Sequence, residues 1–530
     1  MLHLINALRP NNTPQMLKAR ADQVQNNAGG FVFAVSEAQR FLRFLILGTE
    51  GGTFYATEAR QTKLETDFVR DFATLEGATA LEMILDVAHY NRAPKPEPTL
   101  VALAAVAKLS VDAATRKAAW DALPEVARTG THLLHFLEFV QLFGGWGRLT
   151  RGGVAKLYET MPLEKLALWA VKYKSRDGWT QADALRLSHP ETADATRNAL
   201  FKFLVDGVLE SNDAALNMVR GHLLVQEASS DKEAATIMGE YKLPIEAIPT
   251  HVRGAKVYRT ALENNGLTWT LRNLGNLGKH GLLVPGAWEI IEQVVARVTD
   301  AENLRKGRIH PIDALKAMFV YQGGRSIKGD GTWAVVPQIV DALEKAFYTS
   351  FGTITPARKR FVLGLDISGS MTCGNIAGVH GLTPNLASTA MAMLTLRSET
   401  NSHIMGFADS FRDVGIRAND TLEAALKKTQ NQSFGGTDCA LPMLWALENG
   451  VQADVFVIYT DNETYFGKVH PFEALRRYRN KMGIAARLVV VGMTATQFSI
   501  ADPKDAGMMD VVGFDSSAPN IISSFARGQF

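Results

Sequence analysis

Apolar residues recur every three or four positions through most of residues 64–350, and the alternation typical of strands is scarce. This spacing predicts a succession of amphipathic helices, separated by short turns that carry Gly or Pro. So many helices with short links favour an α-solenoid of helical pairs, with an ordinary all-α domain as the alternative because no repeat period is visible. The predicted helices include residues 78–88, 99–109, 111–123, 131–143, 163–173, 193–209, 213–226, 288–298 and 312–321.

The N-terminal residues have a different pattern. Residues 1–30 are polar and rich in Asn, which predicts an extended, weakly structured arm. Ser36 is a favourable helix-capping residue. The apolar positions after it predict an amphipathic helix over residues 36–47 that carries Arg40 and Arg43.

From residue 361 the pattern changes to alternating apolar strands and helices. The strands are continuously apolar, as expected when both faces are covered, so this region predicts a doubly wound α/β domain with a mostly parallel sheet. We place the boundary near 350–360, which gives a helical domain over 1–355, arm included, and an α/β domain over 356–530. The predicted strands are 361–365, 403–408, 454–460, 487–492 and 509–513, and the predicted helices are 385–400, 420–429, 438–448, 471–482 and 519–527.

Side chains with oxygen atoms follow two strands of the α/β domain. The first strand leads into Asp366-Ile-Ser368-Gly-Ser370, a later strand ends at Asp461, and Thr437 lies in a loop between them. The carboxyl ends of parallel strands meet at one edge of a sheet, and carboxylates combined with neutral hydroxyls suit Mg²⁺. We therefore predict that these five residues form a divalent metal site for Mg²⁺. The alternative is a metal-free loop in which the two aspartates only hold the local structure.

Charge gives a weak signal for a partner. The formal net charge is +2 over 530 residues, so the composition does not indicate nucleic acid. Residues 1–360 carry 43 Lys and Arg against 38 Asp and Glu, a net charge of +5, whereas residues 361–530 carry 13 against 16, a net charge of −3. The helical part is therefore the better candidate for contact with a polyanion.

Cysteine usage and hydropathy indicate the compartment. Cys373 and Cys439 are the only cysteines, which is too few for a disulfide scaffold, and we expect free thiols. The N-terminus lacks the basic segment of a secretory signal, and no stretch approaches the roughly 18 apolar residues of a membrane span. A cytoplasmic protein with no membrane partner is expected.

The sequence argues against an enzyme. It contains no P-loop, no nucleophile elbow and no His-Glu-x-x-His motif. Two-metal phosphoryl chemistry needs clustered carboxylates that hold both ions, and a serine-rich loop does not provide them. A metal-dependent nuclease is therefore disfavoured, and we predict a protein that is not an enzyme.

The three candidate metal loops resemble the metal-ion-dependent adhesion site of von Willebrand factor A domains. In that site two serines and a threonine bind the ion through their hydroxyls, two aspartates hold ligands or waters, and one position stays open for an acidic group. Together with the long helical region, the chain resembles the Ro autoantigen family, whose helical part is the TROVE module, from about Gly30 to the C-terminus. The segments that carry this resemblance are Arg43–Tyr55, Lys172–Trp179, Leu185–His189, Arg308–Pro311 and Gly436–Met443.

The resemblance implies a ring of HEAT-like helical repeats closed around a central hole, with a von Willebrand factor A-like domain beside it. It also implies RNA binding. Ro proteins hold small noncoding Y RNAs on the outer surface of the ring, and they take single-stranded ends of misfolded or immature RNAs through the hole. We expect the same two classes of RNA to be partners of this chain.

Three residues match the family's Y RNA positions: Lys172, Arg176 and His189. Lys172 and Arg176 are four residues apart and would share a face if the segment were helical. A lysine offers phosphate a point charge, an arginine offers a planar fork, and a histidine can stack or donate. The further candidates are Lys174, which adds nearby charge, and Arg40 and Arg43, which have the alternative role of supporting the ring's first helix.

These observations predict an RNA chaperone or scaffold in RNA quality control, monomeric as a protein, with ribonucleases as candidate further partners. The alternative is a protein-interaction scaffold in which the divalent metal captures an acidic residue of a partner, and the near-neutral net charge favours it. Nucleic acid that copurifies with the protein would favour the first, and a chelator-sensitive protein partner would favour the second.

Overall fold

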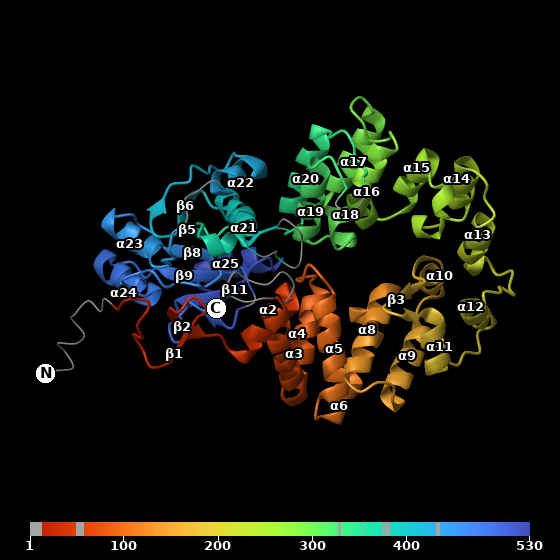
Figure 1. Cartoon of the computed structure of the whole chain (residues 1–530), viewed down its shortest axis with the longest axis horizontal. Helices are drawn as coiled ribbons and strands as arrows, with labels where there is room; N and C mark the ends of the chain where they lie inside the picture. The colour runs from red at the N-terminus through yellow and green to blue at the C-terminus, as the bar shows by residue number, and fades with distance from the viewer. Residues whose placement is uncertain are drawn as a thin grey trace. The chain divides into compact units, whose positions relative to one another are not determined.

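The computed structural model describes residues 13–48, 58–326, 330–352, 354–373, 376, 382–430, 435–494 and 496–529, with 58–65 and 430 described by their backbone alone. The chain divides into two compact units (Figure 1). One, the helical unit, comprises Val69–Asn91 and Pro96–Ser350. The other, the sheet unit, comprises Met1–Phe68, Arg92–Lys95 and Phe351–Phe530. Among the described helices, none combines the length and hydropathy required to cross a membrane.

The helical unit is a succession of short helices that pack against their neighbours along the chain (Figure 1). Ala and Leu side chains fill the contacts, as in α5, where most residues from Leu100 to Ala107 are buried. Its helices are α4 (Gly77–His89), α5 (Glu97–Leu109), α6 (Ala113–Asp121), α7 (Leu123–Val126), α8 (Gly130–Leu142), α9 (Arg148–Thr160), α10 (Leu163–Lys172), α11 (Gln181–Ser188), α12 (Ala195–Asp206), α13 (Asn217–Val225), α14 (Asp231–Glu240), α15 (Ala255–Asn264), α16 (Leu267–Lys279), α17 (Trp288–Thr299), α18 (Ala301–Lys306), α19 (Pro311–Gln322) and α20 (Pro337–Thr349).

The two ends of the helical unit are joined to each other. Asn91, just after α4, donates from Nδ2 to the carbonyl of Arg308, just before α19, at 3.0 Å. The Arg308 guanidinium in turn donates to the Ala88 carbonyl at 3.4 Å. Because residues 217 positions apart meet here, the succession of helices closes on itself, as a ring of helical repeats requires.

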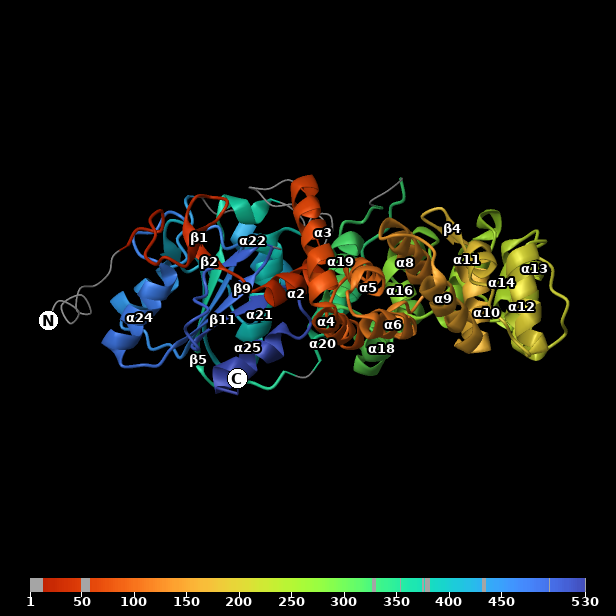
Figure 2. The same cartoon turned by 90° about the horizontal axis from the view of Figure 1, so that it is seen from below.

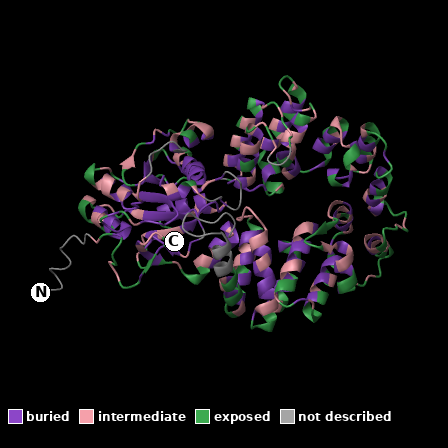
Figure 3. Ribbon diagram, viewed as in Figure 1, coloured by how far each residue is buried: buried purple, intermediate pink, exposed green. Residues whose placement is uncertain are grey.

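The sheet unit contains a six-stranded sheet in the order β11-β9-β8-β5-β6-β7, parallel except for the β6–β7 pair. Its central strands β5, β8 and β9 are almost entirely buried (Figure 3). One face packs on α23 and α24, and α21 contacts β5, β6 and β8 from the other side (Figure 2). The bounds are β5 (Arg360–Asp366), α21 (Pro384–Ser398), β6 (Asn401–Phe407), β7 (Phe411–Arg412), α22 (Leu422–Gln430), α23 (Leu441–Glu448), β8 (Val455–Thr460), α24 (Pro471–Met482), β9 (Arg487–Gly492), β11 (Met508–Val512) and α25 (Ala518–Arg527).

The described part of the N-terminal arm is ordered, which corrects the expectation of a weakly structured segment. Strands β1 (Gln23–Gln25) and β2 (Phe31–Ala34) form a hairpin, and β2 also pairs with β10 (Phe498–Ser499). Phe33 is buried and packs edge-to-face on Phe472, 5.4 Å between ring centroids. Residues 1–12 of the predicted arm lie outside the described residues.

The division into units therefore differs from the predicted domains at the N-terminal end. The second boundary falls between Ser350 and Phe351, close to the predicted 355/356, but residues 1–68 belong with the sheet unit rather than with the helices. The cause is the apolar side of β2, which completes the core over α24.

Helix α2 (Glu37–Leu47) follows β2 and begins at Ser36 with the expected capping box. It carries Arg43, which was a candidate for RNA contact and for supporting the first helix of the ring. The Arg43 side chain is only 1% exposed, and its Nη2 donates to both carboxylate oxygens of Asp510 of β11, at 2.7 and 2.6 Å. It also donates to the Phe498 carbonyl at 2.9 Å. The expectation of RNA contact is corrected, because a buried, paired guanidinium cannot reach a phosphate. The expectation that Arg43 supports the ring's first helix is also corrected, because Arg43 lies in the sheet unit.

We predict that Arg43→Ala lowers the unfolding free energy of the sheet unit by about 3–5 kcal/mol, because it leaves the buried Asp510 carboxylate without its partner. Urea unfolding measures this loss. Arg40→Ala is the matched control, since Arg40 is half-buried on the same helix and stacks on Phe68, a contact worth about 1 kcal/mol. Equal losses of unfolding free energy in Arg43→Ala and Arg40→Ala would contradict the assignment of Arg43 to a stabilising buried ion pair.

Candidate functional site

The first candidate site lies where β5 and β8 end. Asp366 is the last residue of β5, and its two carboxylate oxygens accept from the Ser368 backbone N–H at 3.0 Å and from the Thr460 hydroxyl at 2.7 Å. A 3₁₀ turn over Gly369–Thr372 follows, and it places the Ser368 and Ser370 hydroxyls 3.0 Å apart. The Ser370 side chain also lies close to the Asp461 carboxylate. Asp366, Ser368 and Ser370 are thus in one hydrogen-bonded group, with Asp461 beside it.

Thr437 reaches this group through its backbone. Its carbonyl accepts from the N–H groups of Tyr465 and Phe466, both at 3.0 Å, in the loop that follows Asp461. The next residue, Asp438, donates its N–H to the Ala408 carbonyl at the end of β6. Thr437 is 2% exposed. The structure thus brings the three predicted loops to one edge of the sheet, as their positions after parallel strands predict.

Asp366 and Asp461 have no cationic partner among the residues that the structure describes. In the described part of the chain neither Asp366 nor Asp461 forms an ion pair, and both are buried. Burial, reinforced by repulsion from Asp461, raises the pKa of Asp366 to about 7. Burial also raises the pKa of Asp461. These donors fit a divalent cation, because an ion beside them would supply the missing positive charge.

Sequence reasoning missed a second layer around this group. Gln15 and Asn26 of the N-terminal segment are buried against the loops that carry Asp438 and Thr464. Their signal in the sequence is the run of uncharged amides within the segment that was expected to be an extended, weakly structured arm. Cys439, also beside these loops, is buried, and both it and Cys373 are free thiols, as expected.

The second candidate site is the segment that follows α10, and this segment is not helical. Helix α10 ends at Lys172, and Arg176 lies on a two-stranded hairpin of β3 (Ser175–Arg176) and β4 (Trp179–Thr180). The turn residues Asp177 and Gly178 both have positive φ, 50° and 81°, as a tight two-residue turn requires. Lys172 and Arg176 therefore do not share a helix face.

The hairpin presents Arg176 from a fixed base. Its Nε donates to His135 Nε2 on α8 at 3.1 Å, and His135 Nδ1 contacts the Asp177 carboxylate. The Arg176 side chain is 54% exposed, and its terminal nitrogens make no hydrogen bond to described residues. Lys172 pairs with Glu246 at 3.6 Å. Lys174 and His189 are exposed, and His189 ends α11 in a left-handed conformation with a φ of 49°.

A basic cluster that the sequence did not predict lies within the helical unit. We call it the Arg128 cluster: Arg128, His132, Lys165, Arg272 and Arg308, which come from widely separated parts of the chain. Burial and the nearby Arg308 guanidinium lower the pKa of Arg128 to about 10. Burial and Arg128 likewise lower the pKa of Lys165. Isolated basic residues at such intervals leave no pattern in a sequence, so only the fold brings them together.

His132 shows how positive this cluster is. Burial first, and then repulsion from Arg128, lower its pKa to about 4, and Arg272 adds to the repulsion. Its Nδ1 is buried without a hydrogen-bond partner among the described residues. No carboxylate within the described residues forms an ion pair with Arg128 or Lys165. Half-buried cations without counter-charges are suited to bind an anion.

A closed set of helical repeats and a doubly wound sheet with an Asp-x-Ser-x-Ser loop define a class: helical-repeat proteins with a von Willebrand factor A-type domain. The TROVE domain matches residues 24–240, and the Ro60 vWA domain matches residues 360–526. The chain is 57% identical to the RNA-binding protein RO60 of Deinococcus radiodurans, over the full length of both chains. It is 34% identical to the RNA-binding protein RO60 of Caenorhabditis elegans, over 97% of this chain and 92% of the relative.

A solved structure agrees with these relatives. The crystal structure of the Deinococcus radiodurans RO (RSR) protein superposes with a TM-score of 0.73 at 58% identity, covering 93% of this chain and all of that chain. The chain belongs to the Ro60 family of RNA-binding proteins. The relatives are named as RNA-binding proteins and not as enzymes, which agrees with the predicted absence of catalysis.

We predict that the RNA-free helical unit loses stability as the pH falls below 6.5, in part because of His132. Its folded pKa of about 4 lies below the ordinary value of 6.5, so the unfolded chain takes up the proton first. This one group should cost about 2 kcal/mol between pH 6.5 and pH 5. Urea unfolding over this range measures the loss, and His132→Gln should flatten the profile.

His89→Gln is the control for that experiment, since His89 is an exposed histidine on α4 of the same unit. It should leave the pH profile unchanged. Parallel profiles for the wild type and His132→Gln would contradict the assignment.

Proposed function

We propose that this protein is an RNA chaperone and scaffold that holds RNA at two places on the helical unit. A structured Y-type RNA would bind around the β3–β4 hairpin, and a single-stranded end of a misfolded or immature RNA would bind at the Arg128 cluster. Bound RNAs would be passed to ribonucleases in quality control. Membership of the Ro60 family supports RNA as the ligand.

The observation that carries this proposal is the charge of Arg128 and Lys165, with which no described carboxylate forms an ion pair. Burial, and then repulsion from Arg308, lower the pKa of Arg128, which is an unfavourable arrangement without an anion. A phosphate placed between them would relieve the repulsion. Phosphates recur along a nucleic acid chain, so RNA satisfies several such groups at once.

The hairpin supports the second binding place. Arg176 is held through Nε by His135 and exposes its terminal nitrogens, so a phosphate can be bound with little loss of side-chain entropy. Lys172, Lys174 and His189 are nearby in sequence and add donors of different shape. Shape and phosphate positions, rather than base sequence, would then decide which structured RNA binds.

We predict that Arg128→Ala with Arg272→Ala weakens binding of a single-stranded RNA oligonucleotide and lowers its salt dependence. Each lost phosphate contact should reduce the slope of log K against log salt by about 0.7. Fluorescence anisotropy over a salt series measures both effects. Lys172→Ala with Arg176→Ala should instead weaken binding of a Y-type RNA and leave the oligonucleotide affinity nearly unchanged.

Lys202→Ala with Arg259→Ala is the charge-matched control for both experiments. These two residues are exposed on the same unit and pair with Glu210 and Glu289. If the control weakens binding as much as either test pair, the affinity comes from net charge and both assignments fail.

We also propose that the edge of the sheet unit holds Mg²⁺. Ser368, Ser370 and Thr437 would supply hydroxyl oxygens, and Asp366 and Asp461 would supply the negative charge. When bound, the ion would offer an open position to a carboxylate or phosphate oxygen. The buried carboxyl pair supports this second candidate function, the docking of an acidic partner group.

We predict that Ser368→Ala with Thr437→Ala abolishes binding of Mg²⁺ or Mn²⁺. Calorimetry measures the affinity, and the loss of metal-induced thermal stabilisation gives a second readout. Ser402→Ala is the matched control, because Ser402 lies at the opposite end of the sheet, paired with Phe361. Unchanged metal affinity in the double variant would contradict the site.

A further inference from the structure

The N-terminal segment, residues 13–30, holds both of the later loops of the candidate metal site. Its contacts are made by neutral amides and by the backbone, and several of them are buried. The two loops are the one that carries Thr437 and Asp438 and the one that follows Asp461. Residues from the beginning of the chain are therefore built into a site that is otherwise encoded in its last third.

Gln15 is the central contact. Its side chain is fully buried, and Nε2 donates to Asp438 Oδ1 at 2.7 Å and to the Val469 carbonyl at 2.8 Å. Oε1 accepts from the Thr464 hydroxyl and from the Gly467 N–H at 3.3 Å. Both donors and both acceptor positions of this amide are used, so it fixes one arrangement of the loops it joins.

These contacts lead directly to Thr437. Asp438 is its neighbour in sequence, and the Thr464 hydroxyl lies 3.2 Å from the Thr437 carbonyl. The packing is close, since a Cβ on Gly467 would lie 2.3 Å from Gln15 Nε2. Neither loop can shift without moving the Gln15 side chain.

Asn26 and Asn27 hold the loop after Asp461. Asn26 Nδ2 donates to the carbonyls of Asn462 and Thr464, at 3.2 and 2.8 Å. Asn27 Nδ2 and the Ala28 N–H donate to the two carboxylate oxygens of Glu463, at 2.7 and 3.0 Å. The segment therefore contacts Asn462 and Glu463, which follow the predicted ligand Asp461. It also contacts Asp438, which follows the predicted ligand Thr437.

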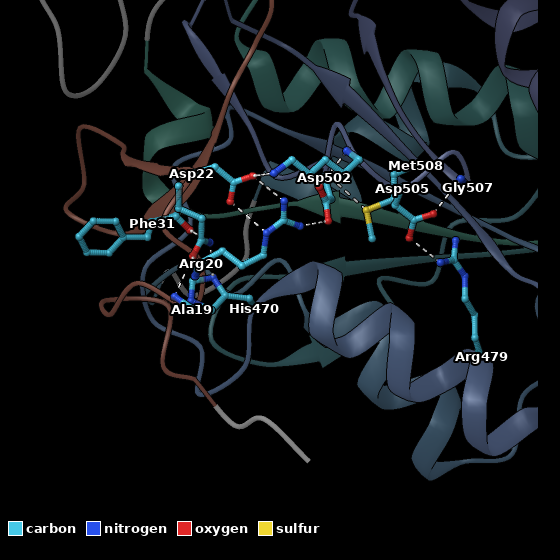
Figure 4. Close-up of polar contacts among 12 residues, drawn as sticks. Ala19, Arg20, Asp22, Phe31, His470, Arg479, Asp502, Asp505, Gly507 and Met508 are labelled. Atoms are coloured by element: carbon cyan, nitrogen blue, oxygen red, sulfur yellow. Dashed lines mark hydrogen bonds and ion pairs between the residues drawn. The ribbon is translucent and has the colours of Figure 1, made fainter. Parts of the chain in front are cut away.

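A separate anchor of the same segment lies away from these loops. Arg20 lies between Asp22 and Asp502 (Figure 4). Its guanidinium also stacks over Phe33, 4.8 Å from the ring centroid. Lys504 also reaches Asp22, at 2.9 Å. This ionic anchor attaches the segment to the loop after β10 and does not contact the metal loops.

From these contacts we infer that Gln15 is a positioning residue for the metal site, and that residues 13–30 set its affinity for a divalent cation. Gln15 touches no predicted ligand side chain and acts through Asp438 and Thr464. The inference rests on the metal site proposed above. Groups that orient metal ligands typically change affinity by 10–100-fold when they are removed.

The test compares Mn²⁺ affinity, measured by electron paramagnetic resonance on the full-length protein, at a temperature where every variant is folded. Gln15→Ala should weaken binding by roughly 10–100-fold. Asn27→Ala removes an exposed side chain that holds Glu463, so it should fold and still weaken binding in the same direction. Gln25→Ala is the matched control, because Gln25 is exposed and its side chain donates to the Gly29 carbonyl within its own turn.

Arg20→Ala separates positioning from general stability. It should lower the melting temperature measured in chelator while leaving Mn²⁺ affinity within about threefold of the wild type, since its partners lie outside the metal loops. Unchanged affinity in both Gln15→Ala and Asn27→Ala, whatever their stability, would overturn the inference. A wild-type protein that binds no Mn²⁺, or binds it equally after Ser368→Ala with Thr437→Ala, would instead overturn the proposed metal site.

Discussion

Unbalanced charge is the physical constraint on which both units depend. In the sheet unit, Asp366 and Asp461 are buried together at the ends of β5 and β8, and neither forms an ion pair with a described residue. In the helical unit, Arg128 and His132 are drawn out of water beside further cations, and no described carboxylate pairs with Arg128. Each arrangement costs folding energy unless a ligand of opposite sign is bound. The sheet unit is thus suited to bind a cation, and the helical unit is suited to bind a polyanion.

Much of the fold could be predicted from hydrophobic spacing. The β5, β8 and β9 strands and helix α24 fall within a residue or two of their expected bounds, because continuous apolar runs and a Pro-led amphipathic stretch leave few alternatives. The metal loops were predictable for a related reason, since parallel strands bring their carboxyl ends together. The N-terminal hairpin was missed because Phe31–Ala34 is short and its partner β10 lies more than 460 residues away.

The errors in predicting where the basic residues lie have a different cause. Arg43 and Arg176 look equivalent in sequence, yet one is buried against Asp510 and the other is exposed on a hairpin. The Asp177-Gly178 pair is a local signal for that hairpin, and the sequence analysis did not use it. The Arg128 cluster had no local signal, because its members meet only after the helices close on themselves. Spacing along the chain therefore predicts helices and strands well. It does not predict which charged residues from distant parts of the chain come together.

The pairing of Arg43 with Asp510 has a consequence for synthesis of the chain. These residues are 467 positions apart, so at roughly 5–20 residues per second the ribosome needs on the order of half a minute or more to deliver the partner. The helical unit emerges in between and can fold first. Until then the N-terminal segment has no partners in the sheet unit to pack against. Its amide-rich, polar sequence suits a segment that stays exposed during synthesis without aggregating. The helical unit can thus fold while the chain is still being synthesised. The sheet unit can be completed only when translation ends.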